Sequence, residues 1–389
     1  MEYCSICQDK LKCGKITCPV VVKYFSKKVI LKKDFFGKSP NIFVGRFNYP
    51  EIKVGLLSAE DYFENDNPLL WKEKNFSIGQ IINLRCSLIN ANYYTNVKNF
   101  DSKFKEISQE VALAYKPVEL EINLNKIPSA GVTVRRELLP FGPSVTMIQS
   151  KITENPKIPL KVEKLVNDEV KTEESLAQLF EQGFDEHYLT KILSAGLLGQ
   201  NKKLVPTRWS ITATDQILSN NFIKQIKEFD VFDYQLYFGS YLGNYYLIMF
   251  MPEIWSYELF EMYVKKYDCS TDFEFYNGRT TYASNCVGGY YSVRLAVNEF
   301  LKRIKKQASV LVLRFITDEY EAPLGVWVTR EASRNSLLSK PIKFSSKVEM
   351  LNYAKLFVKN KFDYDIDFVL KKSQLLKYYN SQRKLNDFS

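Results

Sequence analysis

Histidine is almost absent from this chain of 389 residues, in which His187 is the only one. A Ser–His–Asp triad needs a histidine beside its nucleophile, and a multi-histidine metal centre needs several, so both classes of site are nearly excluded. His187 lies on the flank of a predicted helix, in the segment FDEHYLTKI, where we expect an ordinary helix residue rather than a catalyst.

Long apolar runs are also missing. No stretch of about twenty uncharged apolar residues occurs, as a membrane-spanning helix would require. The N-terminus reaches Lys10 and Lys12 without an apolar segment, so it lacks the pattern of a secretory signal peptide. We therefore expect a cytoplasmic protein, in which cysteines stay reduced and a cluster of them indicates a metal site rather than disulfide bonds.

Apolar and aromatic residues are plentiful, at 46% and 14% of the chain, which is enough for a sizeable core. Strand and helix patterns mix without regular βαβ alternation, and this predicts an α+β fold in which helices accompany a mixed sheet. We divide the chain into a zinc knuckle at 1–20, an N-terminal α+β region at 21–160, a C-terminal α+β region with a candidate pocket at 161–370, and a tail at 371–389.

Apolar spacing and turn residues predict the individual elements. Two stretches, 40–56 and 117–150, have strand character, a hairpin turns at Gly243-Asn244, and a buried strand at ASVLVLRFIT has LGVWVTR as its possible neighbour. The stretch 151–171, rich in charge and containing two prolines, is the best candidate linker. We place helices at 77–90, 101–114, 173–181, 185–195, 257–267 and 293–306.

The net charge of +10 is concentrated at the two ends of the chain. Residues 1–60 carry eleven Lys and Arg against five Asp and Glu, residues 340–389 carry the same balance, and the middle is nearly neutral. Such charge attracts the phosphates of nucleic acid through counterion release. A solvated, lysine-rich surface of the kind found in thermophiles explains the charge equally well.

Four of the seven cysteines form the motif Cys4-x2-Cys7-x5-Cys13-x4-Cys18. Four thiolates satisfy the tetrahedral coordination of zinc, and with every position filled such a site is structural. We therefore expect a structural Zn²⁺. An iron–sulfur cluster is the alternative, although the spacing matches neither ferredoxin pattern. Metal analysis distinguishes the two.

The last eight residues fit the sliding-clamp-interacting pattern Gln-x-x-aliphatic-x-x-aromatic-aromatic. In a 3₁₀ turn, residues three apart share one side, so Gln382, Leu385 and Phe388 could together fill a hydrophobic pocket. Ser389 stands where the pattern has its second aromatic, which should weaken binding. The alternative is the frayed end of the preceding predicted helix, 370–379.

Several central segments combine aromatic rings with arginines, as sites for phosphates and unpaired bases do. A Gly288-Gly289 turn opens a predicted helix whose N–H groups could hold a phosphate, although a tight turn with aromatic packing explains it equally well. The candidate nucleic-acid or nucleotide ligands are Arg46, Arg208, Trp209, Arg279, Tyr282, Tyr290, Tyr291, Arg294, Arg314, Trp327 and Arg330.

The segment RFITDEYEAPLGVWVTRE carries the candidate catalytic carboxylates Asp318, Glu321 and Glu331. Carboxylates can bind a catalytic metal or act as acid and base. Clusters of this kind more often form surface ion pairs or a stabilising network.

Taken in order, these segments resemble the archaeal Nre family of DNA-repair proteins. The resemblance spans essentially the whole chain, and it implies a cytoplasmic role in the repair of DNA damage with docking on the replication sliding clamp through the C-terminal motif. It carries over no catalytic residue. The segments that carry it are the cysteine motif with Cys18-Pro19, FVGRFNYPEIKVG, TRWSITATD, SYLGNYY, GRTTYASNCVGGYYSVRLAVNEFL, QASVLVLRF, EYEAPLGVWVTRE and the tail.

The leading hypothesis is therefore a DNA-binding repair factor that the tail recruits to the clamp. The alternatives are an enzyme that acts on DNA or a nucleotide through the central carboxylates, and an adaptor without pocket chemistry. Convergence of the central arginines, tyrosines and carboxylates in one cleft would favour a pocket.

Overall fold

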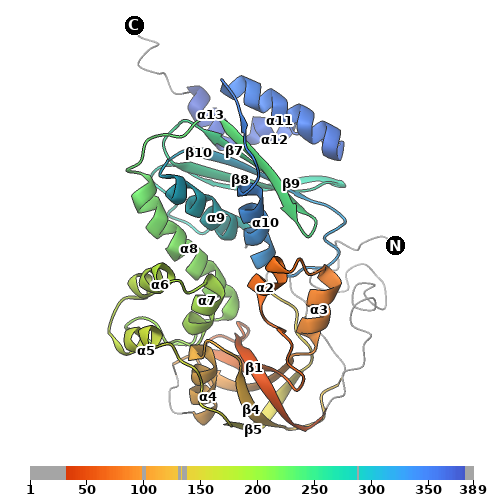
Figure 1. Cartoon of the computed structure of the whole chain (residues 1–389), viewed down its shortest axis with the longest axis vertical. Helices are drawn as coiled ribbons and strands as arrows, with labels where there is room; N and C mark the ends of the chain where they lie inside the picture. Colours follow the sequence, from red (N-terminus) through yellow and green to blue (C-terminus); the bar gives the residue numbers. More distant parts are fainter. Residues whose placement is uncertain (1–31, 99–101, 130–132, 134–137, 287–288, 382–389) are drawn as a thin grey trace. The chain divides into compact units, whose positions relative to one another are not determined.

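The computed structural model describes residues 32–98, 102–129, 133, 138–286 and 289–381 (Figure 1). The chain divides into two units. Unit 1 comprises the residues up to Leu218 together with Glu321–Gly325, and unit 2 comprises Ser219–Tyr320 and the residues from Val326 onward. Both units combine strands and helices, so the predicted α+β class is confirmed. The zinc knuckle and the clamp motif both lie outside the described residues.

Unit 1 is built on a closed five-stranded barrel with the strand order β1-β2-β3-β5-β4. The barrel closes because β1 pairs with both β2 and β4. All neighbouring strands are antiparallel except β3 and β5, which are parallel. The strands are β1 (Asp34–Val44), β2 (Glu51–Ala59), β3 (Ile89–Asn96), β4 (Val118–Leu124) and β5 (Ser144–Ile152), and the helix α4 (Lys103–Leu113) connects β3 to β4.

The double pairing of β1 requires it to bend. Its first half pairs with β4, its second half pairs with β2, and the register shifts between Lys38 and Asn41. Gly37 lies at the bend, where an added Cβ would come within 2.6 Å of the carbonyl oxygen of Ala59. Only glycine allows this close approach of the two backbones.

Alternating burial along the strands gives the barrel an apolar interior. On β2, Ile52, Val54 and Leu56 are buried, while Glu51 is exposed and Lys53 is half-buried. On β4, Leu120 and Ile122 are buried. The outer face is open to solvent at the start of β2 and the end of β3, where Lys53 and Tyr94 lie, whereas Leu57 and Ala59 further along β2 are buried in a small apolar cluster.

The remaining helices of unit 1 lie between and after the barrel strands. Local caps explain two of them, because Ser77 and Gln80 form a capping box at the start of α3 and the carboxylate of Asp185 accepts two N–H groups at the start of α7. The helices predicted at 77–90, 101–114, 173–181 and 185–195 are confirmed, with α3 ending at Cys86. The helices are α2 (Pro68–Glu73), α3 (Ile78–Cys86), α5 (Leu160–Asn167), α6 (Thr172–Glu181), α7 (Glu186–Ser194) and α8 (Thr207–Ile226), the last of which runs past the boundary into unit 2.

The predicted linker at 151–171 contains regular structure, since β5 runs to Ile152 and α5 fills much of the rest. The boundary between the units lies later, at Leu218.

Unit 2 contains a six-stranded mixed sheet in the order β11-β6-β7-β10-β8-β9. The hairpin predicted at Gly243-Asn244 joins β6 to β7, and ASVLVLRFIT forms the central strand β10. The strands are β6 (Gln235–Tyr241), β7 (Asn244–Met251), β8 (Ser256–Tyr263), β9 (Lys266–Glu274), β10 (Ser309–Ile316) and β11 (Ile342–Lys343).

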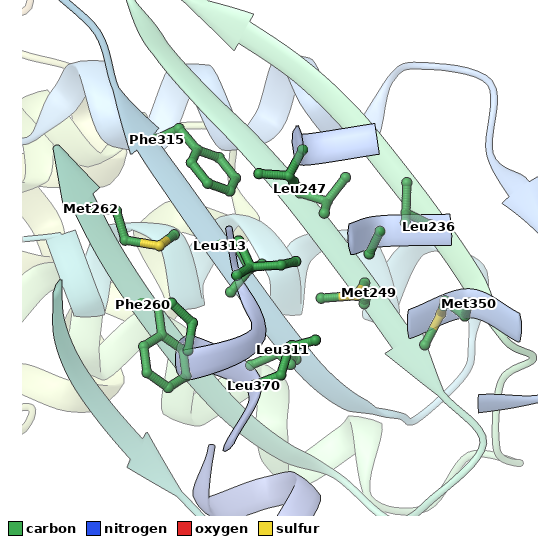
Figure 2. Close-up of a cluster of buried hydrophobic side chains, with 14 of the residues drawn as sticks. Leu236, Leu247, Met249, Phe260, Met262, Leu311, Leu313, Phe315, Met350 and Leu370 are labelled. Atoms are coloured by element: carbon green, nitrogen blue, oxygen red, sulfur yellow. The ribbon is translucent and has the colours of Figure 1, made fainter. Parts of the chain in front are cut away.

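Helices cover both faces of this sheet (Figure 1). One face carries α9 (Gly289–Ile304) and α10 (Trp327–Leu337), and the other carries α11 (Lys347–Phe362), α12 (Asp367–Lys372) and α13 (Gln374–Ser381). Figure 2 shows the core on the second face, where the side chains of β7, β8 and β10 meet Met350 and Leu370 of the helices. The helix predicted at 293–306 is confirmed by α9.

Two element predictions in unit 2 are wrong. The stretch 257–267 was predicted to be a helix, but it forms β8 and the start of β9. The segment LGVWVTR was suggested as a possible neighbour of the strand ASVLVLRFIT, but α10 begins within it at Trp327. Both predictions failed because tertiary contacts outweigh local propensity. The strand β8 lies between β10 and β9 with both faces covered. The helix α10 packs its β-branched residues against the sheet.

No helix within the described ranges is both long enough and apolar enough to cross a membrane.

Candidate nucleic-acid interface

The turn between β1 and β2 lies beside the start of α8. The backbone N–H of Val44 donates to the hydroxyl of Thr207 at 2.9 Å. The rings of Tyr49, in the turn, and Trp209, in the first turn of α8, contact each other with centroids 5.2 Å apart and planes tilted by 53°. Tyr49 is 43% exposed and Trp209 is 44% exposed, so the ring pair stands at the protein surface.

The end of β3 joins the same region through the backbone. The N–H of Val97 donates to the carbonyl of Pro50 at 3.0 Å, and the N–H of Leu204 donates to the carbonyl of Val97, also at 3.0 Å. The turn, the end of β3 and the segment before α8 are thus hydrogen-bonded side by side. We call the surface that these segments form with the adjoining outer face of β2 and β3 the barrel-end surface: Arg46, Phe47, Tyr49, Lys53, Tyr94, Lys98, Lys203, Arg208 and Trp209.

Exposed aromatic rings alternate with cations on the barrel-end surface. Phe47 is 60% exposed and Tyr94 is 63% exposed. The Nζ of Lys53 lies 4.9 Å from the ring centroid of Tyr94, its neighbour across the β2–β3 ladder, and the guanidinium carbon of Arg46 lies 5.4 Å from that of Phe47. These cation–π contacts orient the cations without neutralising their charge.

One carboxylate belongs to the same surface. Glu51 lies at the start of β2 and accepts a hydrogen bond of 2.5 Å from the side-chain amide of Asn96. Among the described residues of the barrel-end surface, five basic side chains accompany this one carboxylate. Positive charge and solvent-facing rings together suit a ligand that carries phosphates and flat aromatic groups.

Sequence reasoning found only part of this surface. Arg46, Arg208 and Trp209 were among the predicted ligands, and the structure brings all three to it. Phe47 and Tyr49 were missed, although the segment FVGRFNYP places an aromatic residue close to Arg46 on both sides. The pairing of Lys53 with Tyr94 has no local signal, because it depends on the register between two strands.

The other predicted ligands lie in unit 2, where most are buried and two of the buried arginines, Arg294 and Arg314, form ion pairs. The guanidinium of Arg294 contacts Glu274 at 2.6 Å and donates to Asn220 at 2.6 Å. The hydroxyl of Tyr290 donates to the same Glu274 at 2.8 Å. Burial, and then the charge of Glu274, raises the pKa of Tyr290 well above its usual value, so the hydroxyl remains a donor. This is an internal network.

Arg314 is held in a second buried pair. It contacts Glu261 at 2.5 Å and donates twice to the side chain of Asn244. The carboxylate of Glu261 lies against Gly289, the first residue of α9, so closely that a Cβ on Gly289 would collide with it. An internal carboxylate therefore lies at the first turn of α9, where the sequence left a phosphate site and a tight turn with aromatic packing as equal alternatives.

Arg279 organises the loop between β9 and α9. Its guanidinium donates to the carbonyl of Phe273 at 2.7 Å and lies 3.3 Å from the carboxylate of Asp272. Tyr282, in the same loop, is exposed and its ring lies against the buried Tyr291. Of the predicted ligands in unit 2, Tyr282 is the one most open to solvent.

Trp327 and Arg330 are both buried on α10. The ring of Trp327 meets that of Tyr241 edge-on, with centroids 6.0 Å apart. Their burial places them in the packing between α10 and the sheet.

The three candidate carboxylates do not form one cluster within unit 2. Asp318 is exposed and pairs with Lys265, and Glu331 pairs with Arg334 at 2.7 Å. Glu321 belongs to the short segment assigned to unit 1. In the described part of the chain no group of three or more His, Cys, Asp and Glu side chains is arranged to hold a metal ion.

The cysteines Cys4, Cys7, Cys13 and Cys18 and the tail residues Gln382, Leu385 and Phe388 lie outside the described residues. The zinc knuckle and the clamp motif therefore stay predictions. The last described helix, α13, ends at Ser381, directly before the motif.

Comparison with known proteins identifies relatives over most of the chain. Two family models match, described as archaeal Nre, N-terminal (residues 12–267) and archaeal Nre, C-terminal (residues 274–388). From Archaeoglobus fulgidus, "DNA repair protein NreA" is 39% identical over 92% of this chain and 94% of its own, and "DNA repair protein NreB" is 33% identical over 99% of both. "DNA repair protein NreA" from Haloferax volcanii is 35% identical over 77% of both chains. No solved structure matches.

Proposed function

The chain belongs to the archaeal Nre family, and from this membership we propose that it is a DNA-repair factor. It binds DNA through the barrel-end surface and docks on the replication sliding clamp through its C-terminal tail. The names of its relatives support the repair role. The observation that carries the DNA-binding part is the gathering of five cations and four exposed rings on one hydrogen-bonded surface.

Phosphate neutralisation makes the proposal quantitative. Each lysine that contacts a phosphate releases condensed counterions, so the logarithm of the binding constant falls with the logarithm of salt concentration by about 0.7 to 0.9 per contact. We expect affinity for DNA to fall steeply between low and moderate salt.

The test neutralises three lysines of the barrel-end surface at once, as Lys53→Gln, Lys98→Gln and Lys203→Gln. The salt slope, measured by fluorescence anisotropy with labelled DNA, should shrink by about 2 to 3. The matched control neutralises three exposed lysines elsewhere in unit 1: Lys157, Lys161 and Lys164. A slope that changes equally in both triple variants would contradict the assignment of the surface.

The clamp-docking part rests on the tail motif and on the firm attachment of the helix before it. The carboxylate of Glu258 on β8 accepts from the hydroxyl of Ser373 at 2.5 Å and from the N–H groups of Gln374 and Leu375 at 2.9 and 3.2 Å. The start of α13 is therefore fixed to the sheet, and the motif begins one residue after this helix ends.

Deleting residues 382–389 should abolish binding of the purified sliding clamp. Phe388→Ala should do the same, whereas Lys384→Ala, at a position that the pattern leaves open, should not. Ser389→Phe supplies the second aromatic of the pattern and should tighten binding. Surface plasmon resonance measures all four, and binding that survives the deletion would exclude the tail as the docking site.

A structural zinc ion held by the four N-terminal cysteines is part of the same proposal. Four thiolates leave no open coordination position, so the ion would stabilise the N-terminal segment rather than take part in a reaction. One zinc per chain in a colourless protein is expected from metal analysis, and iron with sulfide would overturn it.

A further inference from the structure

The barrel of unit 1 has a specific topology. Its strands follow the order β1-β2-β3-β5-β4, β3 and β5 are parallel, and α4 fills the connection between β3 and β4. A bent β1 closes the barrel by pairing with β2 and β4. This is the arrangement of the OB-fold, a five-stranded Greek-key barrel that binds oligonucleotides or oligosaccharides on the face of strands 2 and 3 and with the loops joining strands 1–2 and 4–5.

The barrel-end surface overlaps that binding face at its solvent-exposed end, the start of β2 and the end of β3. Lys53 projects from β2 and Tyr94 from β3, at paired positions of the ladder. Phe47 and Tyr49 belong to the loop between strands 1 and 2. Topology and side-chain chemistry therefore point to the same face independently, since the strand order is a property of the backbone alone.

We propose that the barrel-end surface binds single-stranded DNA, with unpaired bases stacked on Tyr94, on Phe47 and on the Tyr49–Trp209 pair and with the neighbouring lysines at the phosphates. This rests on the DNA-binding function proposed above and names the form of the substrate. In a duplex the faces of the bases are stacked on each other, so the exposed protein rings find few base faces on which to stack. On a single strand every base offers a face.

The spacing of the rings suits successive bases. Tyr94 lies three residues before Val97, whose N–H bonds to Pro50 beside Tyr49. Three residues of strand span about 10 Å. Two rings in stacking contact have centroids about 4.5 to 7 Å apart, so Tyr94 and the Tyr49–Trp209 pair hold different bases.

The positive charge selects the class of chain among the ligands of such barrels. Lys53, Lys98 and Lys203 lie along the described part of this surface, together with the carboxylate of Glu51. A neutral oligosaccharide gains nothing from these cations, whereas a polyphosphate backbone does.

Trp209 supplies a direct spectroscopic test in the full-length protein. Of the four tryptophans, Trp71, Trp255 and Trp327 are buried and only Trp209 is open to solvent. Titration with a 20-nucleotide oligothymidylate should quench the tryptophan fluorescence and protect it from iodide. Trp209→Phe should lose the quench while anisotropy with labelled oligonucleotide shows that binding persists, because a phenyl ring still stacks.

Alanine variants separate stacking from charge. Phe47→Ala, Tyr94→Ala and Trp209→Ala should each weaken single-strand binding by roughly 5- to 100-fold while leaving the salt slope unchanged, because they remove a stacked base but no cation. The matched control is Phe36→Ala, an aromatic that is 49% exposed on β1 where that strand pairs with β4, away from the proposed face. Melting temperatures verify that each variant is folded.

The outcomes are distinguishable. Single-stranded DNA should bind at least tenfold more tightly than a duplex of the same sequence at equal salt, and more tightly than RNA of that sequence. Equal or tighter binding of the duplex would overturn the single-strand proposal while leaving the DNA-binding function intact. Preference for the RNA would overturn the choice of DNA. Absence of binding to any nucleic acid at low salt would overturn both proposals together.

Discussion

At the scale of single residues, burial changes the pKa of a charged side chain and its contribution to stability, and Lys191 on α7 shows this most clearly. Its Nζ is enclosed in unit 1 and donates to the carbonyls of Ala114 at 2.7 Å and Pro40 at 3.2 Å. Burial lowers the pKa of Lys191 from 10.5 to about 8, against the opposing effect of Asp66 and Asp185. The two carbonyls hold the charged form only partly, because they carry dipoles rather than a full negative charge.

This shift predicts a pH dependence of stability. The unfolded chain keeps the proton of Lys191 up to pH 10.5, whereas the folded chain releases it near pH 8, so the unfolded state binds more protons between these values. The free energy of unfolding should therefore rise with pH across that window, by up to about 3 kcal/mol from this residue.

The comparison with Lys191→Met isolates this contribution. The difference in melting temperature between the wild type and the variant should change steadily from pH 8 to pH 10.5, because the other titrating groups are common to both chains. A difference that stays constant over this window would refute the assignment.

Residue type alone does not say whether an arginine faces a ligand or the interior. Arg46 and Arg208 contribute to the barrel-end surface, whereas Arg294 and Arg314 are buried against carboxylates from distant strands. Each buried pair joins residues twenty or more positions apart. The sequence shows the arginine but not which carboxylate lies opposite it, so both kinds of arginine fitted the same aromatic–arginine pattern.

At the scale of secondary structure, β8 shows how a local pattern can mislead. Its residues Ser256 to Met262 are all buried, including the carboxylates Glu258 and Glu261 on opposite faces of the strand. A strand covered on both faces loses its alternation. Acidic residues within an apolar stretch then resemble the polar face of a helix, which is why the helix prediction for 257–267 failed.

The attachment of α13 to β8 predicts a local effect of Glu258→Ala. The carboxylate satisfies two N–H groups at the start of the helix, and its removal leaves them without an acceptor inside the protein, at a cost of about 1 to 3 kcal/mol. Amide hydrogen exchange over 374–381 should accelerate by about tenfold or more.

Glu349→Ala is the matched control, since Glu349 accepts from Ser345 beside the start of α11 instead. It should alter exchange at α11 and leave α13 unchanged. Equal exchange at 374–381 in wild type and Glu258→Ala would show that other contacts hold the helix.

At the scale of the whole molecule, the proposed functions divide between the two units. The barrel-end surface belongs to unit 1, whereas the helix that leads to the clamp motif belongs to unit 2. The excess positive charge of the chain supports association with DNA over distances greater than any single contact.

This division predicts where DNA protects the protein. Saturating single-stranded oligonucleotide should slow hydrogen exchange in β2, β3 and the segment 203–210, since a ligand that binds only the folded state suppresses opening. Peptides from β7 and β10 should exchange at the same rate with and without DNA. Hydrogen-exchange mass spectrometry measures both, and protection centred on β7 and β10 would place the DNA in unit 2 instead.

The sequence by itself determined the α+β class, the helices α3, α6 and α7, of which α3 and α7 have side-chain caps, the hairpin between β6 and β7, and membership of the Nre family. These features depend on neighbouring residues, such as a cap three positions from its partner or a glycine between two apolar runs, or on the order of motifs along the chain. Only the tertiary structure decided the closure of the barrel, the pairing of Lys53 with Tyr94, and the placing of Trp209 beside Tyr49. These depend on strand register and on contacts between segments as much as 160 residues apart, which local patterns do not encode.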